Sequence, residues 1–146
     1  MIAVLQRVSQ SQIHVDQELI ASIEQGLMVL VGIEKNDQQE QMDKFIHKVL
    51  NYRIFVDNED KMNLNLQQIN GGLLLIPQFT LAADTNKGLR PSFSQCETPS
   101  AARLKFAELL DKTRQIYPAT QSGKFGADMK VSLINDGPVT FTFQFK

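Results

Sequence analysis

The sequence predicts an α+β fold in which an antiparallel or mixed β-sheet, curled toward a barrel, is covered by two main helices. Both ends of the chain consist of short runs of alternating apolar residues, the pattern of half-buried strands. Between them, two longer segments carry apolar residues at helical spacing. No internal repeat, low-complexity tract or linker interrupts the 146 residues, so we expect a single domain over residues 1–146.

The first quarter of the chain is predicted to be β-structure. In the first run, Ile2, Val4 and Val8 alternate on one face, and Arg7 places a charge at the end of an apolar face, where it needs a partner. The turn at Asp16-Gln17 indicates a hairpin. The expected strands are residues 2–8, 12–15, 18–23 and 27–31, the last wholly apolar and therefore central.

Two helices are expected. Residues 37–40 have capping-box spacing, and the helix that they start is expected to run to about Phe55. Its inward stripe is Met42, Phe45, Ile46, Val49 and Leu50. Thr98 as N-cap and Pro99 in the first turn begin the second helix, which Pro118 stops. Its inward residues are Ala102, Phe106, Leu109, Leu110 and Thr113 or Ile116.

The middle of the chain contains one further strand and two irregular segments. Residues 57–63 form a polar connector that lacks the glycine and the regular oxygen ligands of a calcium loop. Residues 73–76 form a buried strand that runs into Pro77. Residues 82–96 show no apolar periodicity, and a loop of that length suggests a function or disorder.

The Gly137-Pro138 step is the most informative local feature. It separates the runs 129–133 and 139–145, which both read as strands. On local grounds residues 135–138 form a hairpin connection, because they are the four commonest turn residues. The alternative is a backbone device that interrupts strand pairing and turns carbonyl groups outward, since proline cannot donate to a ladder.

Composition excludes several classes of function. The single cysteine, Cys96, rules out an internal disulfide framework, and no apolar run reaches the length of a membrane span or signal segment. We therefore expect a cytoplasmic protein with no membrane partner. The net charge of −1 gives no overall field toward nucleic acid. We expect no DNA partner, and any RNA contact must be local.

The familiar catalytic sets are absent from the sequence. His14 and His47 fall on polar faces, and Cys96 has no neighbouring basic residue that would favour its thiolate. There is no zinc spacing, phosphate loop, dinucleotide fingerprint or Gly-x-Ser-x-Gly elbow. We therefore expect neither a metal nor another cofactor.

What remains is Gln78-Phe79-Thr80 at the end of a buried strand. A ladder leaves unpaired N–H groups where it stops, and two adjacent donors can bind the oxyanion that develops during attack on an ester. The Thr80 hydroxyl is either a nucleophile or an orienting group, and we favour the second because no neighbouring base is apparent. The plain alternative is that residues 78–81 only cap a strand.

Together these segments resemble the D-aminoacyl-tRNA deacylase family. The resemblance spans nearly the whole chain and is highly specific, because two separated motifs occur in the expected order. The segments that carry it are Gln6-Arg7-Val8, Asn51-Tyr52-Arg53-Ile54-Phe55, Pro77-Gln78-Phe79-Thr80-Leu81-Ala82-Ala83-Asp84-Thr85, Gly88-Leu89-Arg90-Pro91-Ser92-Phe93-Ser94 and Asn135-Asp136-Gly137-Pro138-Val139-Thr140.

The resemblance implies a homodimeric hydrolase that cleaves the ester between a D-amino acid and the terminal ribose of tRNA, and that also acts on mischarged glycyl-tRNA. Gln78, Phe79 and Thr80 would line the catalytic site. Gly137 and Pro138 would form a Gly-cis-Pro element that enters the partner's pocket, with Arg7 holding it in place. Much of the catalysis would come from the 2′-hydroxyl of the substrate.

The chain departs from the family pattern at Pro77, where serine is usual, so a hydroxyl and a backbone N–H are lost. Candidate phosphate contacts for tRNA are Lys87, Arg90, Lys124 and Lys130. Two rival hypotheses stay open: an esterase or amidase with Thr80 as nucleophile, and a catalytically silent dimeric RNA-binding protein, which Pro77 makes conceivable.

Overall fold

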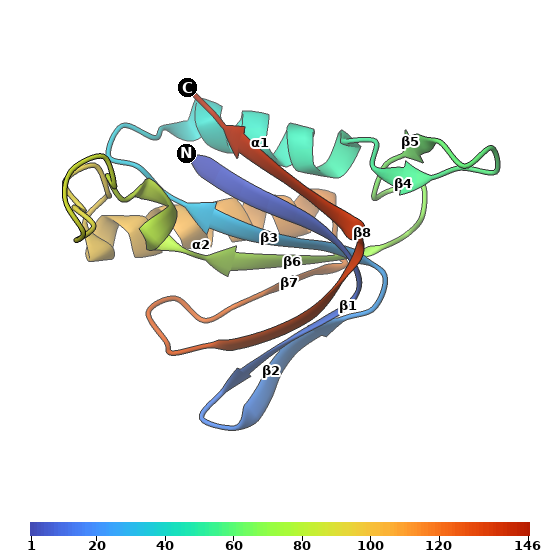
Figure 1. The fold of residues 1–146 in the computed structure, drawn as a ribbon, viewed down its shortest axis with the longest axis horizontal. Helices are drawn as coiled ribbons and strands as arrows, with labels where there is room; N and C mark the ends of the chain where they lie inside the picture. The colour runs from blue at the N-terminus through green and yellow to red at the C-terminus, as the bar shows by residue number, and fades with distance from the viewer.

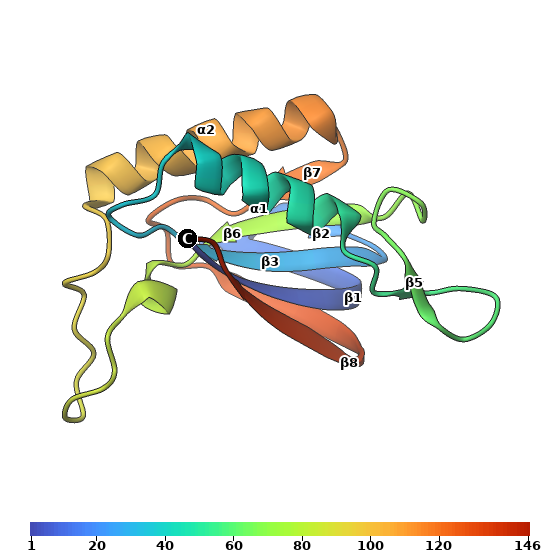
Figure 2. The ribbon, with the colours of Figure 1, turned by 90° about the horizontal axis from the view of Figure 1, so that it is seen from above.

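The computed structural model describes residues 1–146 and shows one six-stranded mixed sheet with two helices packed on the same face (Figures 1 and 2). The sheet order is β2-β1-β3-β6-β7, and β8 pairs with the other edge of β1. The predicted fold class is confirmed. No helix is both long and apolar enough to cross a membrane. The elements are β1 (Ile2–Val15), β2 (Glu18–Ile23), β3 (Gly26–Gly32), α1 (Gln39–Asn51), β4 (Phe55–Val56), β5 (Met62–Leu64), β6 (Gly72–Pro77), the 3-10 helix η1 (Phe79–Ala82), α2 (Pro99–Ile116), β7 (Thr120–Ser122) and β8 (Lys130–Gln144).

The sheet is organised around β1. This strand pairs antiparallel with β2 and β3 on one side and with β8 on the other. The two strands expected at residues 2–8 and 12–15 are one continuous strand. Polar Ser9 and Gln10 interrupt the apolar alternation, but Gln10 pairs with Ile134 of β8, and Ser9 lies where the register with β8 shifts. The strand therefore continues through an irregularity that the composition does not reveal.

Two apolar clusters form the core. The larger one, of 19 buried residues, lies between the sheet and the helices and includes Phe45 of α1 and Phe106 of α2. The smaller one joins Val8 and Ile13 of β1 to Leu74 and Ile76 of β6, so strands of the same sheet pack against one another through their side chains. This second cluster is the physical reason for the curl toward a barrel, which Figure 1 shows in β1, β2 and β8.

The helices differ from expectation at their ends. The N-cap of α1 is Gln38, whose capping box is completed by Gln41, one residue later than the predicted spacing. The helix ends at Asn51 instead of about Phe55, because Phe55 pairs with Leu64 in the small β4–β5 hairpin. The predicted connector 57–63 therefore contains part of a strand.

The second helix follows the prediction closely. Thr98 is its N-cap and Pro99 its first residue, as expected. Of the two alternatives for the last inward position, Thr113 is buried and donates to the carbonyl of Leu109, whereas Ile116 is 60% exposed.

The hairpin prediction for residues 135–138 is wrong. Strand β8 continues through Gly137-Pro138 as one element that runs along β1, and its register shifts at this step. The Gly137-Pro138 peptide bond is cis. The chain therefore bends without reversing, and it leaves Gly137 and Pro138 exposed on an edge strand.

Candidate active site

The end of β6 presents free backbone donors. The Gln78 amide still donates to Val31 O at 2.7 Å, which closes the ladder between β6 and β3. The amides of Phe79 and Thr80, the first two residues of η1, donate no hydrogen bond within the protein. The first N–H groups of a helix lack intrahelical partners, and here both residues are exposed. Two adjacent N–H groups are therefore available to an oxygen of a ligand.

The side chains around these amides are held in place. Gln78 Nε2 donates to Thr80 Oγ1 at 2.6 Å, so the threonine oxygen accepts there and its proton remains available. The rings of Phe79 and Phe93 pack at a centroid distance of 5.2 Å. Cys96 Sγ donates to Phe79 O at 3.4 Å. Burial raises the pKa of the Cys96 thiol, so it stays protonated and remains a donor.

Arg7 holds the second motif. Its side chain is buried, Nε donates to Asp136 O at 2.8 Å, and a terminal nitrogen donates to Ile54 O at 2.6 Å. The partly exposed Asp136 carboxylate lies 3.5 Å from Nε. Gly137 follows directly, and a Cβ at that position would lie 3.3 Å from the guanidinium. The partner that the sequence required for Arg7 is thus the backbone before Gly137-Pro138.

The two motifs lie far apart within one chain. Strand pairing connects Pro77 of β6 through β3 and β1 to Phe143 of β8, and Gly137 precedes Phe143 on that strand. Three strand spacings and about four residues along β1 separate the motifs by on the order of 20 Å. The hollow beside Gln78 and Phe79 has a volume of about 20 Å³, room for about one water molecule. A single chain does not enclose a substrate there.

Comparison with known proteins identifies the family of the chain. The family model of D-Tyr-tRNA(Tyr) deacylase matches residues 4–144. The chain belongs to this family. The family predicted from the sequence is therefore confirmed.

Relatives of the chain cover nearly its full length. Proteins named D-aminoacyl-tRNA deacylase are 54% identical in Shewanella frigidimarina, over 99% of both chains, and 53% identical in Pseudomonas fluorescens, over 96% of this chain and 97% of the relative. A solved structure titled c-Myc DNA Unwinding Element Binding Protein has a TM-score of 0.94 at 34% identity, covering 99% of this chain and 98% of its own. A probable eukaryotic D-amino acid tRNA deacylase, with a TM-score of 0.78 at 18% identity over 97% of both chains, shares the fold.

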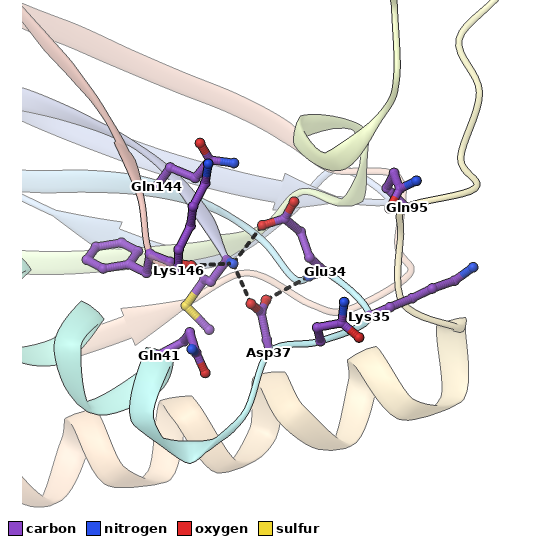
Figure 3. A pocket seen from close by; sticks show the side chains of 10 residues that line it. Glu34, Lys35, Asp37, Gln41, Gln95, Gln144 and Lys146 are labelled. Carbon is purple, nitrogen blue, oxygen red and sulfur yellow. Dashed lines mark hydrogen bonds and ion pairs between the residues drawn. The ribbon is translucent and has the colours of Figure 1, made fainter.

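A roomier pocket lies elsewhere, where the two chain ends meet (Figure 3). Its volume is about 250 Å³, and Figure 3 shows Glu34 and Asp37 in its lining. Both carboxylates form ion pairs with the Met1 ammonium. The ammonium also donates to Phe145 O at 3.1 Å. The Met1 ammonium is thus held by two carboxylates and a carbonyl, and this contact ties the two chain ends together.

The two histidines and Lys130, the other candidate residues, are exposed or half-buried. His47 is exposed on α1, and His14 is half-buried on β1. Lys130 is paired with Asp128 at 2.9 Å, which weakens its candidacy as a phosphate contact. Sequence reasoning missed the support that Phe93, Cys96 and the Ile54 carbonyl give to the two motifs. No local pattern points to these contacts, because each joins segments distant in the chain.

Proposed function

We propose that this protein hydrolyses the ester of D-aminoacyl-tRNA and releases free tRNA and the D-amino acid. The observation that carries the proposal is the pair of free, exposed amides at Phe79 and Thr80, in a chain of the D-Tyr-tRNA(Tyr) deacylase family. Two such donors stabilise the oxyanion that forms when water attacks the ester carbonyl. When this intermediate collapses, the bond from carbon to the ribose oxygen breaks and that oxygen takes a proton.

In this mechanism Thr80 orients the substrate. Its oxygen accepts a hydrogen bond from the side-chain amide of Gln78. A side-chain amide is not a base, so Gln78 cannot remove the hydroxyl proton of Thr80 for nucleophilic attack. The hydroxyl can instead donate to the substrate. The ribose 2′-hydroxyl beside the ester supplies the proton relay that the protein side chains do not.

We infer that Gly137-Pro138 acts in the site of a second copy. Three features support a cross-subunit role: the separation of the motifs within one chain, the exposure of both residues on an edge strand, and the buried Arg7 that fixes the backbone before them. The sheet face opposite the helices also leaves the apolar side chains of Ile2, Val4 and Leu30 only half-buried, a surface suited to a homodimer.

A rigid backbone element explains selection by handedness. D-amino acids share an α-amino group and a configuration at Cα, so carbonyl groups that bind the amine can leave room for one side-chain direction only. An L side chain would then meet the backbone of Gly137-Pro138. Glycine has no side chain to exclude, so mischarged glycyl-tRNA is a substrate as well.

The partner in the proposal is the acceptor end of tRNA. Lys87 and Arg90 lie in the loop between η1 and α2, and Lys124 lies in the loop between β7 and β8. None of the three forms an ion pair within the chain, whereas Lys130 is paired. A local set of cations fits the net charge of −1. No DNA, membrane or cofactor enters the mechanism.

The test is to incubate the purified protein with matched D-, L- and glycyl-tRNA and to measure release of the amino acid. We expect release from the D- and glycyl-tRNA and none from the L form. Release from no substrate would support the silent RNA-binding protein instead. Thr80→Ala should keep substantial activity, whereas loss of all turnover together with a trapped acyl-enzyme would favour the nucleophile hypothesis.

A further inference from the structure

The loop that follows η1 forms a closed finger, here defined as residues 84–92. Asp84 N donates to Ser92 O at 2.8 Å and Ser92 N donates to Asp84 O at 2.9 Å, so the base of the finger is pinned like a short hairpin. Figure 2 shows this loop reaching away from the sheet and from both helices. The finger is therefore an ordered projection whose tip the rest of the chain leaves uncovered.

The tip carries positive charge without internal compensation. Lys87 and Arg90 are exposed, and neither makes an ion pair or a side-chain hydrogen bond within the chain. The one acid of the finger is Asp84, at the base, and its carboxylate already accepts two hydrogen bonds from Asn86. Several other lysines are paired with carboxylates, namely Lys44, Lys61, Lys105, Lys112 and Lys130.

The tip also has a shape that suits a ligand. A hollow of about 350 Å³ is lined by residues of the finger itself, among them Thr85, Leu89 and Arg90. Leu89 is fully exposed, with no apolar contact to explain its presence. An apolar side chain between two free cations suits a single-stranded nucleic acid, in which charged phosphates alternate with bases that have flat, apolar faces.

The finger is tied to the candidate active site at both ends. It begins two residues after η1, and just after its end Phe93 packs on Phe79. Five extended residues from Asp84 to Leu89 span at most about 17 Å. A phosphate bound at the tip therefore lies within a few nucleotides of an ester held at the Phe79 and Thr80 amides.

We propose that the finger binds the phosphodiester backbone of the single-stranded 3′ end of tRNA, with Lys87 and Arg90 each contacting one phosphate. This inference rests on the proposed function and deepens it. It assigns affinity for the RNA to the finger and leaves the chemistry to the amides of η1. Removal of the two cations weakens substrate binding and leaves the reacting groups unchanged.

The experiment compares the wild type with the double variant Lys87→Ala/Arg90→Ala on two substrates, D-aminoacyl-tRNA and the corresponding D-aminoacyl-adenosine, which lacks the phosphates. On the tRNA substrate we expect KM to rise about tenfold at unchanged kcat, and the slope of log affinity against log salt to fall by about 1.4, or 0.7 for each phosphate contact. Activity on the adenosine substrate stays at the wild-type value. The control double variant Lys48→Ala/Lys61→Ala removes the same charge from α1 and the β4–β5 segment, and it leaves both substrates unaffected.

Four results would overturn the proposal: an unchanged KM and salt slope, an equal loss on the adenosine substrate, an equal effect of the control variant, or dissociation of the double variant into monomers by analytical ultracentrifugation. The last would make the finger an interface between copies of the chain. Binding of uncharged tRNA to wild type and variant is measured in parallel by filter retention. If the wild type hydrolysed no D-aminoacyl-tRNA, the proposed function would fail, while this binding measurement would still decide the role of the finger.

Discussion

Replacing Arg7 with alanine tests how the Gly137-Pro138 element is held. The side chain is 8% exposed and makes two charge-assisted hydrogen bonds, to Asp136 O at 2.8 Å and Ile54 O at 2.6 Å. Each such bond contributes about 1.5 to 3 kcal/mol, and the substitution also leaves two carbonyl groups without their donor. We expect a loss of about 3 kcal/mol in the free energy of unfolding. For a domain of this size, that lowers Tm by roughly 6 to 12 °C.

Arg53→Ala is the matched control. Arg53 also donates to one backbone carbonyl, Asn63 O at 2.7 Å, and it neighbours Ile54 in sequence, but its side chain is exposed. Its loss should cost at most about 1 kcal/mol. The two variants are compared by urea unfolding followed by circular dichroism and by calorimetry. Equal losses in both variants would refute the view that Arg7 is a buried anchor.

The same variant has a functional consequence. A looser backbone at Gly137 should admit L side chains, so the ratio of kcat/KM for D- over L-aminoacyl-tRNA should fall about tenfold or more, or about 1.4 kcal/mol of discrimination. Arg7→Lys keeps the charge but not the planar fork of donors, so its ratio of kcat/KM for D- over L-aminoacyl-tRNA should lie between those of the wild type and Arg7→Ala. Undiminished discrimination in a folded Arg7→Ala protein would contradict the role given to this arginine.

Two further predictions concern η1 and Cys96, which donates to Phe79 O. Phe79→Pro removes the amide donor at the first position of a helix, where proline fits, so kcat should fall about a hundredfold to a thousandfold. The control Phe79→Ala keeps the amide, and its kcat should fall at most about tenfold. Equal losses in kcat would exclude the oxyanion role of the Phe79 amide. Because burial raises the pKa of the Cys96 thiol, the thiol contributes stability that is fully present below the pKa of the unfolded protein and is lost as pH rises through the higher pKa of the folded protein. Alkylation by iodoacetamide at pH 8 should be slow in the native protein and fast in urea. Equal rates would show that the thiol is not shielded.

Much of the fold follows from local sequence pattern. The two apolar stripes place α1 and α2, since their buried residues recur at helical spacing. The wholly apolar run 27–31 gives the central strand β3, which pairs on both sides. These predictions hold because burial on one or both faces leaves a direct mark on the sequence.

The errors arise where distant pairing overrides local preference. Residues 135–138 have the composition of a turn, yet pairing with β1 on both sides of the step keeps the chain running in one direction. The helix predicted to reach about Phe55 ends at Asn51, because Phe55 pairs with Leu64 in the β4–β5 hairpin. The support of Phe79 by Cys96, 17 residues away, likewise depends on the tertiary fold.

We infer that each active site combines the η1 amides of one chain with the Gly137-Pro138 element of a second. Mixing two impaired variants tests it directly. Phe79→Pro removes the amide donor, and Gly137→Ala distorts the element because φ is +145° and the added Cβ would lie 2.9 Å from Val139 N. After unfolding and refolding together in equal amounts, half of the dimers pair one chain of each kind, and each of these holds one intact site.

D-aminoacyl-tRNA deacylation by the refolded mixture is the decisive measurement. We expect recovery to about a quarter of wild-type activity, because half of the dimers carry one working site of two. Activity that stays at the level of the separate variants, in a mixture shown to contain mixed dimers, would contradict a site shared between two chains.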